Sequence, residues 1–290
     1  MVEYLVGVDG GGTATRALIA RVGGPVLGEG RAGPSALGQG IASAWTQVQL
    51  AITNAFAAAR LTPPPWGRYA LGAGLSGVSN RPWRDEFAAL NPGFAHLIAE
   101  TDSFTMLLGA HAGKPGAIVA AGTGSIGEVM RPDGSRFSVG GWGFPVGDEG
   151  SGAWLGLRAV RLAQCAMDGR INAGTLVRHV WATCGADRDT LQAWCDQAGQ
   201  FAYAQLAPAI FDAEATDPAA AHLLSRAVSS LDATALALDP HGGLPLAVCG
   251  SIGRRLAGRL SPAVRSRLVD AADGPAAGAL TLIRRAVEAQ

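Results

Sequence analysis

The segment YLVGVDGGGTATRALIARV, residues 4–22, decides the fold class because two strand-like runs flank a glycine-rich turn. The runs at 4–8 and 16–22 are mainly aliphatic, which is typical of buried strands. The turn DGGGT at 9–13 joins them, and a third strand-like run follows at 26–31. We therefore predict three strands that tight glycine turns connect as a meander.

A second segment with the same order lies further along the chain. A strand at 116–122 leads into the turn TGS, and two more strands are expected at 126–130 and 135–141. Asp9 and Gly122 are 113 positions apart, so the two meanders mark the starts of two related halves.

The remaining sequence predicts helices and short strands in alternation. These are helices at 41–60, 102–113, 151–168, 188–212, 217–238 and 276–289, and strands at 69–77, 96–102 and 244–253. The predicted fold is α/β, with two βββαβα-like halves and a helical insertion in the second. The domains are expected at 1–113 and 114–277, with the closing segment 278–290 packing back on the first.

The stretch AAGTGSIG at 120–127 has the G-x-G-x-x-G spacing of a dinucleotide-binding turn. That motif requires the glycines to open a long helix. Here residues 126–130 run directly into the turn RPDG at 131–134, so the helix cannot form and a dinucleotide site is disfavoured. No G-K-[ST] sequence of a Walker loop occurs in the chain.

Both glycine turns can instead bind phosphate. Without β-carbons, such a turn can direct several backbone N–H groups at one oxyanion. An ordinary hairpin turn would carry the same glycines, so one turn alone would not decide the question. Two turns at matching places in a duplicated framework favour a phosphate cleft between the halves.

Composition excludes several classes of protein. The 290 residues carry formal net charge +0, which argues against nucleic acid as a partner. The pair Arg254-Arg255 is typical of an exposed helix face. We expect no signal peptide, and no apolar run reaches the ~20 residues that a membrane helix needs. The four cysteines lie far apart without CxxC spacing, so we expect a cytoplasmic protein without disulfides or a structural metal site.

Seven segments resemble the actin-like ATPase superfamily of sugar kinases, hexokinases and actin. Within it, they are similar to the N-acetylglucosamine kinase and bacterial glucosamine kinase group of the BadF/BadG/BcrA/BcrD ATPase family. The segments are GVDGGGTATRALIA (7–20), GLSG (74–77), ETDSF (100–104), AAGTGSIGEV (120–129), GGWGFPVGDEGSGAWLGLRAV (140–160), AVCGSIGRRL (247–256) and GPAAGALTLI (274–283). The resemblance implies two ribonuclease H-like βββαβαβα domains that face a nucleotide cleft, with ATP and Mg²⁺ as cofactors.

The resemblance also implies roles for the nucleotide-binding residues. Asp9 would hold Mg²⁺ through water, in keeping with the preference of Mg²⁺ for few carboxylates. The residues that would contact phosphate or adenosine are Gly10, Gly11, Gly12 and Thr13 in the first turn, Gly122, Thr123, Gly124 and Ser125 in the second, and the turn of Gly250, Ser251, Ile252 and Gly253 against the adenosine.

Asp102 is the predicted general base, because it lies where a strand ends and a helix begins and could accept the proton of a sugar hydroxyl. The structural alternative for Asp102 is a helix N-cap, and the two roles can coexist. Glu100 is a fallback carboxylate inside the strand. Ser76 is expected to orient Asp102.

The sugar side of the predicted site rests on Gly141, Trp142 and Asp148, with Thr123, Ser76 and Asp102 also contacting the substrate. Trp142 could instead be a core aromatic residue, and Asp148 a surface acid near a helix N-terminus. Two positions depart from the family pattern, in which asparagine contacts the sugar: Ala36 and Ile126 stand there in this chain.

The sequence therefore predicts an ATP-dependent kinase for the C6 hydroxyl of an amino sugar. N-acetylglucosamine is the favoured substrate. Glucosamine is the alternative, because the segment 201–220 resembles bacterial glucosamine kinases. A more distant alternative is the activator ATPase of a 2-hydroxyacyl-CoA dehydratase, although no cysteine is placed to bind a bridging iron–sulfur cluster. A sugar-responsive repressor and a ligand-binding protein without catalysis are also disfavoured. A homodimer is left open.

Overall fold

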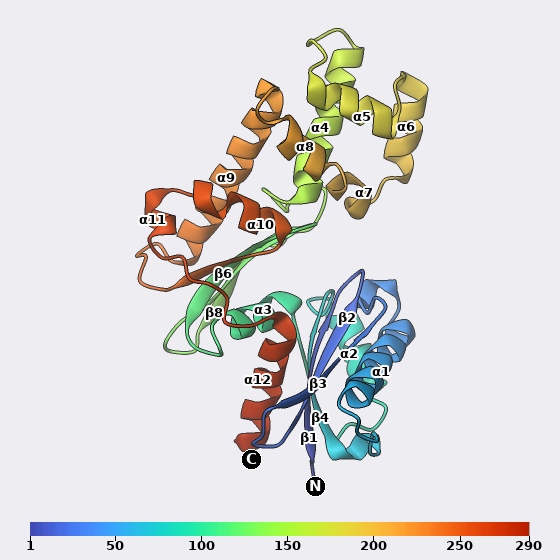
Figure 1. Ribbon diagram of the computed structural model, residues 1–290, viewed down its shortest axis with the longest axis vertical. Helices are drawn as coiled ribbons and strands as arrows, with labels where there is room; N and C mark the ends of the chain where they lie inside the picture. Colours follow the sequence, from blue (N-terminus) through green and yellow to red (C-terminus); the bar gives the residue numbers. More distant parts are fainter. Residues whose placement is uncertain (290) are drawn as a thin grey trace. The chain divides into compact units, whose positions relative to one another are not determined.

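The computed structural model describes residues 1–289, and the chain forms two compact units (Figure 1). The first contains Met1–Gly116, the turn Pro132–Gly134 and the C-terminal segment from Asp270 onward. The second contains Ala117–Arg131 and Ser135–Val269. Gln290, which the sequence analysis assigned to the first domain, lies outside the described residues.

The first unit is built on a five-stranded sheet of order β3-β2-β1-β4-β5. Its strands are β1 (Tyr4–Gly10), β2 (Thr15–Arg21), β3 (Val26–Ala32), β4 (Tyr69–Leu75) and β5 (His96–Glu100). β1, β2 and β3 pair antiparallel, whereas β4 pairs parallel with both β1 and β5. The predicted meander is therefore confirmed, and two parallel strands extend it.

Helices cover both faces of this sheet (Figure 1). On one face, α1 (Ile41–Ala58) and α2 (Arg81–Ala89) bury an apolar core against the strands, with α2 contributing Phe87. On the other face lie α3 (Asp102–Ala110) and α12 (Pro275–Glu288), which pack against each other. The sequence analysis missed α2, which buries only Phe87 and so carries a weak apolar pattern.

The C-terminal helix α12 lies directly on the first sheet because two glycines make room for it. A β-carbon at Gly7 of β1 would overlap the backbone oxygen of Ala276, and one at Gly72 of β4 would overlap that of Ala279. Any larger residue at these positions would push the helix backbone away from the strands and open a gap in the core.

The second unit contains a four-stranded sheet of order β8-β7-β6-β9. Its strands are β6 (Gly116–Ala121), β7 (Ser125–Met130), β8 (Arg136–Gly140) and β9 (Leu246–Cys249), of which β7 and β8 pair antiparallel and β6 and β9 pair parallel. The second meander is thus confirmed. The fifth strand of the implied βββαβαβα pattern is represented in this half by one parallel bridge between Leu246 and Leu268.

A helical insertion lies between β8 and β9. It consists of α4 (Gly152–Met167), α5 (Thr175–Cys184), α6 (Arg188–Gln197), α7 (Gln200–Ala204), α8 (Ala207–Ala213) and α9 (Pro218–Leu238). The prediction of one helix over 188–212 is wrong, because the chain is extended at Ala198 and Gly199, and Pro208 opens a new helix.

The chain returns from β9 through α10 (Ser251–Leu256) and α11 (Pro262–Arg265). Throughout residues 1–289, every helix falls short of the combination of length and apolar character that crossing a bilayer requires.

Candidate active site

Two carboxylates lie near one edge of the first sheet. The register pairs Asp9 of β1 with Gly74 of β4, and Gly74 with Glu100 of β5, two residues before Asp102. Since these strands are parallel, their carboxyl ends share one edge, where open α/β sheets bind ligands. Burial raises the pKa of Asp9 to about 6; the nearby Asp102 carboxylate adds to this rise, and Arg16 opposes it.

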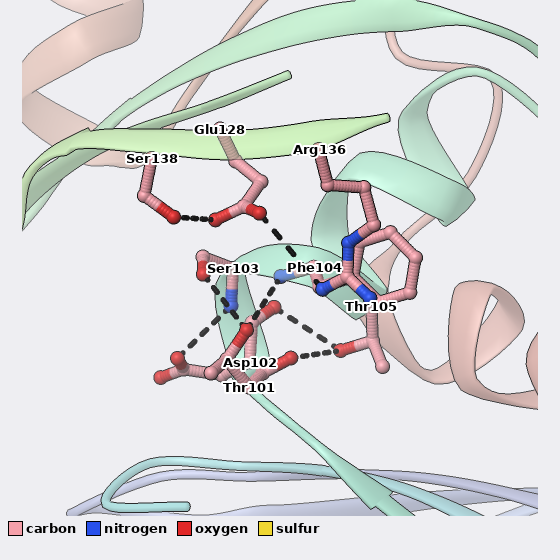
Figure 2. A network of polar contacts seen from close by, with 8 residues as sticks. All are labelled: Thr101, Asp102, Ser103, Phe104, Thr105, Glu128, Arg136 and Ser138. Atoms are coloured by element: carbon pink, nitrogen blue, oxygen red, sulfur yellow. Dashed lines mark hydrogen bonds and ion pairs between the residues drawn. The ribbon is translucent and has the colours of Figure 1, made fainter. Parts of the chain in front are cut away.

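Asp102 is the first residue of α3, and its carboxylate does not cap that helix. Figure 2 shows that Thr101 caps the helix instead, since its hydroxyl accepts the Phe104 N–H at 3.2 Å. The Asp102 Oδ1 atom accepts the Ser103 N–H at 2.9 Å, and burial nevertheless raises the Asp102 pKa. The structure therefore assigns the cap to Thr101 and leaves most of the hydrogen-bonding capacity of Asp102 for another partner.

Figure 2 also shows a polar group that belongs to the second unit. The buried Glu128 carboxylate on β7 accepts a hydrogen bond from the Ser138 hydroxyl at 2.7 Å and lies 3.9 Å from the Arg136 guanidinium, both on β8. These contacts compensate a buried charge within the β7–β8 hairpin.

The first glycine turn is held through its carbonyl groups. The Gly11 oxygen accepts N–H groups of Ser35 and Ala36 at 3.0 and 3.1 Å, and the Gly10 oxygen accepts the Ser76 N–H at 2.9 Å. Within residues 1–289, the N–H groups of Gly12 and Thr13 have no acceptor from the protein. They are therefore available to an anion.

The second glycine turn is fixed in a similar way by the start of α4. The Gly152 N–H donates to the Gly122 oxygen at 2.8 Å, and the Ala153 N–H donates to the Thr123 oxygen at 3.1 Å. The Ser125 hydroxyl donates to the Glu149 oxygen at 2.8 Å. The carbonyl groups of Gly122 and Thr123 are therefore already bonded to the start of α4.

Asp148 is buried beside this turn, so its interpretation as a surface acid is wrong. Only 5% of Asp148 is exposed, and its backbone adopts a left-handed conformation with φ 61°. The Gln200 amide of α7 donates to Asp148 Oδ2 at 2.7 Å. Burial raises the Asp148 pKa, and a hydrogen bond from the Ser125 backbone opposes that rise. The sequence analysis missed Gln200, because nothing in its spacing distinguishes it from other surface glutamines.

Trp142 projects into solvent with 85% of its surface exposed, so its interpretation as a core aromatic residue is wrong. The neighbouring Gly141 and Gly143 have φ values of 69° and 80°, which favour glycine. Ile126 lies against this loop, since a β-carbon on Gly141 would be 2.7 Å from Ile126 Cδ1. The exposed indole thus belongs to a glycine loop against which Ile126 of β7 packs.

A cavity of about 230 Å³ lies within the second unit. Gly122 and Thr123 of the second turn line it, together with Ser251 at the start of α10. The structure therefore brings together two segments that the sequence analysis assigned to phosphate and to adenosine. The remaining lining residues come from α4, α7, α8 and α10 and the links between them: Gly152, Ala204, Gln205, Ala207, Pro208, Phe211, Ile252 and Arg255. Of these, only Ile252, in the turn expected against the adenosine, was predicted as a site residue.

Two residues of the predicted site, Ser76 and Gly250, have structural roles that involve the backbone. Among the described residues, the Ser76 hydroxyl forms no hydrogen bond with Asp102, and Ser76 acts through its backbone on Gly10 and Leu37. Gly250, with φ 81°, allows the chain to turn closely over Ala121 and start α10. Residues 1–289 contain no group of three or more His, Cys, Asp or Glu side chains that could hold a metal ion.

In each of the two sheets, the first strand along the chain is followed by a glycine turn, and this repeated arrangement defines an actin-like ATPase fold. The chain belongs to the BadF/BadG/BcrA/BcrD ATPase family, whose model matches residues 6–247. It is 34% identical to the glucosamine kinase GspK of Vibrio cholerae over 96% of this chain and 95% of that protein.

Solved structures agree with this membership. A protein of Chromobacterium violaceum, provisionally assigned as an N-acetylglucosamine kinase, is 48% identical, with a TM-score of 0.93 over 97% of this chain and 99% of that one. A provisionally assigned N-acetylglucosamine kinase of Porphyromonas gingivalis has a TM-score of 0.68 over 98% of this chain and 99% of that one; at 17% identity it supports the fold alone.

Proposed function

We propose that this protein is an ATP-dependent kinase that phosphorylates the C6 hydroxyl of an amino sugar. Family membership and the named kinases among its relatives support the class of reaction. The observation that carries the chemistry is Asp102, a partly buried carboxylate at the carboxyl edge of a sheet, on a helix that another residue caps.

Asp102 is proposed as the general base. Its carboxylate accepts the proton of the C6 hydroxyl while the hydroxyl oxygen attacks the γ-phosphorus of ATP and ADP leaves. Burial raises the pKa of Asp102, which makes the carboxylate a stronger base at neutral pH. The helix α3 fixes the backbone of Asp102, so the carboxylate is held in place without moving a loop.

The residues of the first unit fit a magnesium ion together with nucleotide phosphates. Asp9 is desolvated, with its pKa at about 6, and it lies near a second carboxylate, an arrangement that a divalent cation would stabilise. Mg²⁺ usually takes one or two carboxylates, waters and phosphate oxygens rather than a cage of protein ligands. When bound, it would supply charge neutralisation at the phosphates.

The glycine turns are proposed to bind the phosphates. The available N–H groups of Gly12 and Thr13 would donate to phosphate oxygens from the first turn, and Thr123 and Gly124 would do so from the second. Rigid donors of this kind stabilise negative charge as it develops on the transferring group.

For the sugar, we propose contacts from Trp142 and Asp148, with N-acetylglucosamine favoured over glucosamine. The exposed indole offers an apolar wall, and Ile126 beside Gly141 adds a surface that suits the methyl of an acetamido group better than an ammonium group. The relatives divide between both sugars: one is named a glucosamine kinase and another an N-acetylglucosamine kinase.

The test is a coupled ADP-release assay with N-acetylglucosamine, glucosamine, N-acetylmannosamine and glucose at equal concentrations. The proposal expects the highest kcat/KM with N-acetylglucosamine and a phosphomonoester at C6 of the product in ³¹P NMR. Faster turnover of glucosamine would change the assignment of the sugar. ADP release independent of every sugar would contradict the kinase function.

A further inference from the structure

One side chain in the cavity of the second unit is held in an unusual position. The Arg255 guanidinium of α10 lies 3.8 Å above the centre of the Phe211 ring of α8. Phe211 is itself buried in the core of the insertion, with only 8% exposed, so the ring is a fixed support. One face of the guanidinium is thus occupied by the ring, and the plane of the group is set before a ligand arrives.

The part of the cavity wall that α7 and α8 supply near Arg255 suits a flat, weakly polar group. The nearby walls are Ala204, Ala207 and Pro208, which are apolar. Glu214 is paired with Arg259, and Arg255 has only the smallest effect in lowering the Glu214 pKa. The cavity volume of about 230 Å³ is below the roughly 300–1,000 Å³ of pockets that enclose a whole ligand.

We propose that Arg255, supported by Phe211, is the platform on which the nucleobase of the nucleotide stacks. The proposal rests on the proposed function, in that it takes ATP as the phosphoryl donor. It also gives the helical insertion a part in nucleotide binding, because α8 supplies the ring and one wall of the cavity. Gln205, also in the lining, offers an amide that can donate to and accept from the edge of a base.

Loss of a stacking contact with the base on removal of Arg255 should weaken nucleotide binding about 10-fold, which corresponds to about 1.4 kcal/mol. A platform for the base affects only ligands that contain a base. If Arg255 instead contacted a phosphate, its removal would weaken the binding of every polyphosphate. Lysine could then substitute for arginine.

The experiment is isothermal titration calorimetry of the full chain with ADP and, separately, with inorganic tripolyphosphate, which lacks a base. The variants are Arg255→Ala and Arg255→Lys, with Arg254→Ala as the matched control on the same helix. We expect about 10-fold weaker ADP binding in Arg255→Ala, little recovery in Arg255→Lys, and unchanged tripolyphosphate binding in both. Arg254→Ala should bind both ligands as the unmodified protein does.

Equal ADP affinity in Arg255→Ala and the unmodified protein would overturn the proposal. So would an equal loss for ADP and tripolyphosphate, full recovery by lysine, or failure of the unmodified protein to bind ADP. The titration needs no sugar and no turnover. A protein that binds ADP through Arg255 but phosphorylates no sugar would therefore refute the proposed function and leave this inference standing.

Discussion

Replacing Asp9 with asparagine should stabilise the ligand-free protein while removing its dependence on Mg²⁺. Burial, with a smaller effect of Asp102, raises the Asp9 pKa from 3.8 to about 6. One pKa unit corresponds to about 1.4 kcal/mol, so the ionised carboxylate costs the folded state about 3 kcal/mol above pH 6. An asparagine side chain at this position would carry no charge and would avoid this cost.

The sign of the pH dependence follows from the direction of the shift. The folded protein holds the Asp9 proton more tightly than the unfolded chain does. The stability contributed by this group is therefore fully present below about pH 4 and is lost as the pH rises from about 4 to about 6. The variant Asp9→Asn should lack this loss, and at pH 7.5 its Tm should be higher by roughly 5 °C.

The assay is thermal unfolding by circular dichroism between pH 4.5 and 8 in EDTA, with and without added Mg²⁺ and ADP. In the presence of ADP, added Mg²⁺ should raise the Tm of the unmodified protein further and leave that of Asp9→Asn nearly unchanged. The control is Asp85→Asn on the exposed surface of α2, with an expected change under about 0.5 kcal/mol. A Tm of Asp9→Asn equal to or below that of the unmodified protein at pH 7.5 would refute the reasoning.

Three further substitutions test separate parts of the account. Trp142→Ala should raise the KM for the sugar about 10-fold and leave the KM for ATP unchanged in steady-state assays, since aromatic contacts contribute about 1 kcal/mol or more; an unchanged sugar KM would count against the sugar wall. Thr101→Ala should lower the free energy of unfolding by about 1 kcal/mol through loss of the α3 cap, with Thr101→Ser restoring it in denaturant titrations; a neutral alanine variant would show that the cap is dispensable. Gly250→Ala should lower the Tm and the yield of folded protein, because its β-carbon would overlap the Ala121 backbone, and an unaltered Tm would contradict that packing.

Sequence alone predicted the parts of the fold that depend on local signals. Both meanders follow from strand-like runs separated by glycine turns, and these turns need no distant contact to form. The helix predicted over 188–212 was wrong because its composition is helical throughout, and a short extended link at Gly199 and Pro208 at the start of α8 divide it. Such breaks depend on how the pieces pack in the insertion, which a local pattern does not contain.

The candidate site likewise contains residues that the sequence predicted and residues that it did not. The glycine turns were predicted from glycine-rich segments between strand-like runs, and Asp102 from its place between a strand and a helix. The burial of Asp148 and its bond to Gln200 were not, because they join segments 52 positions apart. Arg255 looked like half of an exposed arginine pair, and only its contact with Phe211 of α8 distinguishes it from Arg254.

The most direct test of the central claim is the turnover of Asp102→Asn with N-acetylglucosamine and ATP, measured beside its affinity for ADP. Asparagine keeps the size of the side chain but cannot accept the hydroxyl proton as a carboxylate does. We expect kcat to fall by about 10²–10⁴-fold, the usual contribution of a general base, while the Kd for ADP stays within about twofold. Turnover within a few-fold of the unmodified protein would contradict the assignment of Asp102 as the base.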